Sequence, residues 1–191
     1  MRALKTVFAV TVLLFLVAAA ANTQQKQISD SEYIAQVLSA APEAVAKGAA
    51  VVRMEKNGSM RTLRTGDNGF TCMMMRTDGK GKGQCNDTVT MEFMNDWMKH
   101  VPPPDKVGIS YMLDGDNGAS NTDPYAQAAV HGTGKTADNH WIVTGPHIMV
   151  VGPPSKTLGL TRAQGPDPNK PYMMWAGTPY EHAMIPVAPA K

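Results

Sequence analysis

Apolar positions at helical spacing predict three helices in the first hundred residues. The first begins at Asp30 or Ser31, since either side chain can cap a helix. The second is short, with Pro42 in its first turn, and ends at Gly48. The third covers residues 90–100, where four large apolar side chains share one face: Met91, Met94, Trp97 and Met98.

Short apolar runs separated by turn residues predict strands between the second and third helices. The runs cover residues 49–55, 60–64 and 70–76, and Asn57-Gly58 between the first two is a strong hairpin signal. We therefore expect a three-stranded antiparallel meander. A further apolar run over residues 107–113 fits neither periodicity clearly.

The last third of the chain is rich in Gly and Pro and contains the remaining strand candidates. These are residues 141–151, 157–160, 172–175 and 182–187. Because helices and strands are segregated along the chain, the expected fold class is α+β. Short helices would pack on a small antiparallel sheet, with a loop-rich C-terminal third. No linker divides residues 22–191, which are expected to form a single globular domain.

The first 21 residues have the three-part pattern of a secretory signal peptide. Arg2 and Lys5 precede an uncharged run over residues 6–17, and four alanines follow. An uncleaved membrane helix is the alternative, but the run with its alanines has 16 residues, against about 20 needed to span a bilayer. We expect cleavage after Ala21 and a soluble product without a membrane anchor, located in the periplasm or secreted.

This segment also changes the charge of the chain. The whole sequence has 18 basic and 16 acidic residues, but Arg2 and Lys5 lie in the predicted signal peptide. The remaining chain therefore carries 16 residues of each sign. Since an electroneutral chain lacks the basic surface that neutralises phosphates, nucleic acid is not an expected partner.

Cys72 and Cys85 are the two cysteines of the chain, and they enclose 12 residues. In an oxidising compartment a disulfide between them is the expected state. Metal ligation by the two thiols is the alternative. It is disfavoured because the spacing is not C-x-x-C and no histidine lies within five residues of either cysteine.

Methionine and histidine form the most unusual pattern. Two strand candidates contain His-x-Met, as His147-Ile148-Met149 and as His182-Ala183-Met184. Residues i and i+2 of a strand point to the same face, so each strand would present an imidazole beside a thioether. If the strands paired, His147, Met149, His182 and Met184 would form a ligand set that suits copper, especially Cu(I). The alternative is buried, hydrogen-bonded histidines beside core methionines.

Other motifs are weaker. Oxygen ligands from Asp114, Asp116, Asn117 and Asp123 could bind calcium weakly, although a polar turn explains the same residues. Residues 132–136 resemble the end of a phosphate-binding loop but lack its first glycine. No catalytic motif is present, although a Ser-His-Asp triad assembles in space rather than in sequence.

Several segments resemble a family of exported bacterial proteins without assigned function. They are residues 68–73 (NGFTCM), 85–87 (CND), 119–126 (ASNTDPYA), 144–149 (TGPHIM) and 177–180 (GTPY). The resemblance implies a bacterial, periplasmic protein of one small domain, but no activity or site residues. We therefore expect an exported, non-enzymatic binding or interaction protein of unknown ligand. A soft-metal (copper) protein is the alternative function, and an exported hydrolase is the third.

Overall fold

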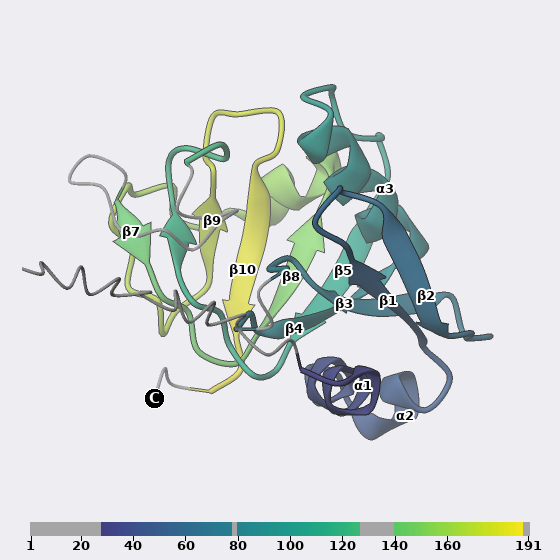
Figure 1. The fold of residues 1–191 in the computed structure, drawn as a ribbon. Helices are drawn as coiled ribbons and strands as arrows, with labels where there is room; N and C mark the ends of the chain where they lie inside the picture. The colour runs from purple at the N-terminus through teal and green to yellow at the C-terminus, as the bar shows by residue number, and fades with distance from the viewer. Residues whose placement is uncertain (1–27, 78–79, 127–139, 189–191) are drawn as a thin grey trace, which may run out of the picture.

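The computed structural model describes residues 28–77, 80–126 and 140–188, in which one large sheet carries short helices (Figure 1). Eight strands follow one another in the order β2-β1-β3-β4-β5-β8-β10-β9. This arrangement agrees with the expected α+β class, but the sheet is mixed and larger than expected. The predicted signal peptide and the 132–136 motif lie outside the described residues.

Helices and strands have the following bounds. The helices are α1 (Asp30–Leu38), α2 (Glu43–Ala46), α3 (Thr88–Met98) and the 3-10 helix η1 (Pro153–Leu158). The strands of the large sheet are β1 (Ala50–Met54), β2 (Met60–Arg64), β3 (Phe70–Met74), β4 (Gly83–Asp87), β5 (Gly108–Met112), β8 (His147–Val151), β9 (Tyr172–Met174) and β10 (His182–Pro186). A separate ribbon pairs β6 (Ala119–Ser120) with β7 (Trp141–Ile142). In the described part of the chain, no helix is long and apolar enough to cross a membrane.

The predicted antiparallel meander is wrong in its third strand. β1 and β2 form the expected antiparallel hairpin, but β3 pairs in parallel with β1, with Val51 opposite Cys72. β2 is mostly polar and exposed, so it suits the edge of the sheet. β3 is apolar and buried, and it therefore lies inside the sheet on the other side of β1.

Three other strand assignments change. The predicted strand at 157–160 is not formed: its first half lies in η1, because Pro153 and Pro154 favour a helical first turn. The candidate at 141–151 is divided into β7 and β8 by Gly145-Pro146. β4 was not expected, since its sequence GQCND lacks an apolar alternation.

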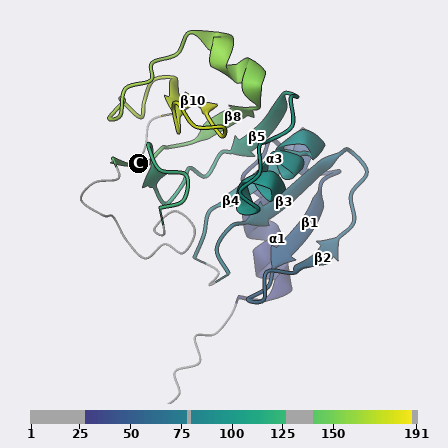
Figure 2. The ribbon, with the colours of Figure 1, turned by 90° about the horizontal axis from the view of Figure 1, so that it is seen from above.

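The alternation of side chains along β3 separates two cores on opposite faces of the sheet. Cys72 and Met74 belong to the core that includes Tyr33 and Val37 of α1. Met73 belongs to the other core, which includes Phe93 and Trp97 of α3. Figure 2 shows the strands from β2 to β10 in their spatial order across the sheet, with α3 beside the middle of the sheet.

The predicted disulfide is confirmed. Cys72 of β3 lies directly opposite Cys85 of β4, and the two sulfurs are bonded. Both residues are fully buried beneath α1. The bridge therefore joins two neighbouring strands in the middle of the sheet rather than closing a surface loop.

The start of α1 provides a first stability prediction. Ser29 Oγ accepts a hydrogen bond from the Glu32 amide at 3.2 Å, and the Glu32 carboxylate accepts one from the Ser29 amide at 2.8 Å. Such a capping box satisfies two amides that would otherwise lack partners. Ser29→Ala is therefore expected to lower the free energy of unfolding by about 1 kcal/mol, measured by urea denaturation. Ser31→Ala should change it by much less, and an equal loss in both variants would contradict the assignment.

Candidate functional site: a methionine- and tryptophan-lined pocket

A cavity of about 460 Å³ lies on the α3 face of the sheet, over β5, β8 and β10. All three tryptophans of the chain line it: Trp97, Trp141 and Trp175. Six methionines contribute to its wall: Met75, Met94, Met112, Met149, Met174 and Met184. The exposed residues Lys82 and Asn117 stand at its mouth. Most of the lining is therefore apolar and polarisable.

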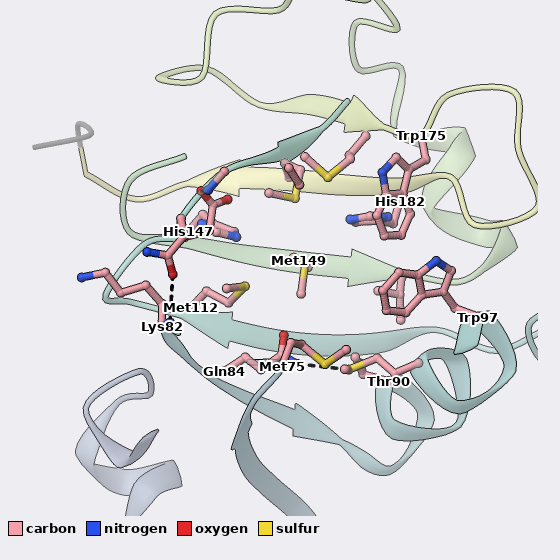
Figure 3. Close-up of a pocket in the computed structure, with 18 of the residues that line it drawn as sticks. Met75, Lys82, Gln84, Thr90, Trp97, Met112, His147, Met149, Trp175 and His182 are labelled. Carbon is pink, nitrogen blue, oxygen red and sulfur yellow. Dashed lines mark hydrogen bonds between the residues drawn. The ribbon is translucent and has the colours of Figure 1, made fainter. Parts of the chain in front are cut away.

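One end of the pocket is aromatic (Figure 3). The rings of Trp97 and Trp175 stack with their centroids 5.5 Å apart. The rings of His182 and Trp175 are nearly perpendicular, with their centroids 4.9 Å apart. The two indole N–H groups do not point freely into the cavity. Trp97 Nε1 donates to the carbonyl oxygen of Pro124, and Trp175 Nε1 donates to that of Ser120. Hydrogen bonds to backbone carbonyl oxygens therefore hold both indole rings in place.

The third tryptophan depends on a glycine. Trp141 comes from β7, and its ring lies against Gly118 in the turn before β6. Gly118 has φ +91°, and a Cβ atom there would lie 2.1 Å from Trp141 Nε1. Both the backbone conformation and the close approach therefore require glycine at this position.

His147 lies at the opposite end of the pocket, with Met149 between it and the pair Trp97 and Trp175 (Figure 3). Its ring is fully buried, and Nδ1 is 2.7 Å from the carbonyl oxygen of Gly145. A carbonyl oxygen only accepts, so Nδ1 carries the proton and Nε2 carries a lone pair. Nε2 has no hydrogen-bond partner among the described residues. Burial lowers the pKa of His147, so its ring is neutral at pH 7.

Asp116 is the carboxylate nearest to this end of the pocket. Its Oδ1 accepts hydrogen bonds from the amides of Gly118 and Thr144, both at 2.9 Å. Burial raises the pKa of Asp116, while the interaction with His147 opposes that rise. The polar groups at this end thus include a neutral imidazole, a carboxylate that already binds two backbone amides, and Lys82 (Figure 3).

His182 is buried at the aromatic end. Its Nδ1 lies 2.9 Å from the carbonyl oxygen of Tyr180, which fixes the proton on that nitrogen. Burial lowers the pKa of His182 from 6.5 to about 4. The ring is therefore neutral across the physiological range and contributes an aromatic surface rather than a charge.

The four residues of the predicted copper site all line this pocket, but not as one compact set. β8 and β10 pair, as the hypothesis required, and Met149 lies directly opposite Met184. The strands are antiparallel, so His147 and His182 are displaced to opposite ends of the pair. His147 is opposite Pro186, which is four residues beyond His182, or about 13 Å at the usual rise per residue. The register therefore offsets the two histidines along the strands, although His147 still contributes to the lowered pKa of His182.

The residues considered for calcium are engaged separately. Asp114 accepts a hydrogen bond from the Ser39 hydroxyl, and Asp123 accepts one from the Tyr125 amide. Asp116 binds the two amides described above. Within residues 28–77, 80–126 and 140–188, no group of three or more His, Cys, Asp or Glu side chains is arranged to hold a metal ion.

Sequence reasoning missed Met112, which the structure places directly opposite His147 on β5. The run at 107–113 contains a usable signal, because Gly108, Ser110 and Met112 occupy alternate positions and would share one face of a strand. Trp175 was also missed as a pocket residue. It follows β9 with φ +56°, a conformation that the residue types around it do not indicate.

The chemistry of the pocket follows from this lining. Thioethers and aromatic rings favour an apolar guest, and one unpartnered imidazole nitrogen provides a polar contact at the end opposite Trp97 and Trp175. Comparison of the chain with protein-family models, curated proteins and solved structures gave no match.

Proposed function

We propose that this chain is an exported, non-enzymatic binding protein whose pocket takes a small, mainly apolar molecule. The observation that carries the proposal is the cavity of about 460 Å³ walled by methionine and tryptophan. Small-molecule sites have volumes in this range and combine an apolar wall with a few polar groups.

Export is part of the proposal and rests on two features. The N-terminal segment has a basic start, an apolar run and small residues before the expected cleavage point. The disulfide between Cys72 and Cys85 is compatible with an oxidising compartment. The resemblance to exported bacterial proteins agrees with this location.

The two ends of the pocket suit different parts of a guest molecule. At one end the stacked rings of Trp97 and Trp175 offer a flat aromatic wall. Toward the other end, methionine side chains are flexible and polarisable, so they adapt to a guest of irregular shape. Burial keeps both pocket histidines neutral, so the part of the guest that contacts them is expected to be uncharged, whereas the basic residues Arg76 and Lys82 also line the pocket.

The environment of the histidines favours binding over hydrolysis. In a Ser-His-Asp triad, Nδ1 of the histidine donates to a carboxylate. Here Nδ1 of His147 and Nδ1 of His182 each face a backbone carbonyl oxygen two residues earlier. His182, whose pKa is lowered to about 4, would also be a weak general base near neutral pH.

Binding of an uncharged naphthylamine dye tests the proposal. The dye is expected to bind with a gain of its own fluorescence and to quench tryptophan emission. Met75→Glu places a carboxylate on the pocket wall and should weaken dye binding at least tenfold. Met60→Glu is the matched control, because Met60 is 39% exposed on the edge strand β2. Equal affinity in the two variants would place the dye outside the pocket and contradict the proposal.

A further inference from the structure

His147 has the geometry of a histidine that is ready to bind a metal ion. Its Nδ1–H donates to the Gly145 carbonyl oxygen at 2.7 Å, which fixes the tautomer and orients the ring. Histidines that bind metals commonly use their second nitrogen in this way. The remaining Nε2 lone pair is buried and unpartnered within the described residues. Leaving such a group unsatisfied costs free energy that a bound ligand would recover.

Methionine side chains of three neighbouring strands line the same pocket as His147. Met112 of β5 is directly opposite His147, and Met149 lies two residues farther along β8 on the same face. Met184 of β10 is directly opposite Met149. Neighbouring strands lie about 4.8 Å apart, and the first two torsions of the flexible methionine side chain allow its sulfur to move several ångströms toward a common point.

Two other candidate ligands of the pocket are less suitable. His182 lies at the aromatic end, separated from His147 by the antiparallel register. The sulfur of Met94 already accepts hydrogen bonds from the side-chain amides of Gln84 and Asn86, at 3.4 and 3.3 Å. The ligand set therefore contains Met112, which the sequence pattern did not indicate, and excludes His182.

We propose that His147 Nε2 and the thioether sulfurs of Met112, Met149 and Met184 form a site for a soft monovalent metal ion, Cu(I) by its chemistry. Imidazole and thioether ligands select such an ion over hard cations. Hard cations also lack the group of carboxylates that they need, since Asp116 Oδ1 is occupied by two backbone amides. This metal site goes beyond the binding of an apolar guest.

Anaerobic titration of the protein with Cu(I), in competition with bicinchoninate, tests the site. One equivalent of Cu(I) should bind, while Zn(II) should not compete. Met112→Leu and Met149→Leu keep the apolar volume but remove a sulfur, and each should weaken Cu(I) binding at least tenfold. Met173→Leu is the matched control, because Met173 is fully buried but does not line the pocket.

A spectroscopic measurement locates the metal independently of affinity. Ag(I), a redox-inert probe of the same charge, should shift the ¹⁵N resonance of His147 Nε2 far more than that of Nδ1. The His182 resonances should move little. Absence of Cu(I) binding, unchanged affinity in both methionine variants, or an unshifted Nε2 resonance would each overturn the site. Dye binding to the same leucine variants reports on the apolar pocket separately, since leucine keeps the wall apolar.

Discussion

Lowering the pH from 8 to 4 is expected to destabilise the folded chain by about 3 kcal/mol through His182 alone. Burial lowers the pKa of His182 from 6.5 to about 4. Between these two values the unfolded chain binds a proton on this ring while the folded chain does not. Acid therefore favours the unfolded state, and the stability present above pH 6.5 is lost as the pH falls toward 4. His147, whose pKa burial also lowers, acts in the same direction.

Urea denaturation at several pH values checks this expectation. His182→Gln removes the titrating ring, so the free energy of unfolding should fall less steeply between pH 6.5 and 4. His100→Gln is the control, because the His100 ring is exposed and stacks on Tyr125. The exposed Asp30, held by Arg61 and Arg53 with its pKa lowered to about 2, stays charged across this window. A slope in His182→Gln equal to that of the parent chain would refute the assignment.

Replacing both cysteines by alanine is expected to lower the free energy of unfolding by about 3 kcal/mol. The bridge joins positions 13 residues apart and restricts the unfolded chain more than the folded one. In the folded chain Cys72 and Cys85 already face each other across β3 and β4, so the strands stay paired without the bond. Alanine is preferred to serine here, because both sites are fully buried and a hydroxyl would need a partner.

Reductant separates the loss of the bond from the loss of the sulfur atoms. The parent chain, unfolded and refolded with dithiothreitol, should lose a similar amount of stability. The double alanine variant should not respond to dithiothreitol at all. If the parent chain kept its full stability after complete reduction, the bridge would contribute little and the prediction would fail.

Local features were predictable because they depend on residues close together in the chain. The helices α1 and α3 follow from apolar spacing, although α1 is capped by Ser29 rather than by Asp30 or Ser31, and the β1–β2 hairpin follows from Asn57-Gly58. The disulfide needed only two cysteines and an oxidising compartment. Strand β4 escaped prediction because distant helices bury its polar sequence: Cys85 lies beneath α1, and Gln84 and Asn86 donate to Met94 of α3.

The sequence predicted each half of the candidate site but not how the two halves are arranged. Each His-x-Met segment could be read as a same-face pair, and both segments do line the pocket. Their relative direction could not be read, because an antiparallel and a parallel pairing of β8 with β10 satisfy the same alternation. The antiparallel register brings Met149 opposite Met184 and moves the two histidines apart.

Spacing of nearby residues was enough to determine the α+β character, the cysteine pair and the side-chain faces of individual strands. Only the tertiary structure decided that β3 lies parallel to β1, that Met112 faces His147, and that Trp97 stacks on Trp175. The reason is that strand order and register depend on how distant segments bury their apolar surfaces against each other. The hydrophobic pattern within one strand does not specify which strand it pairs with or in which register.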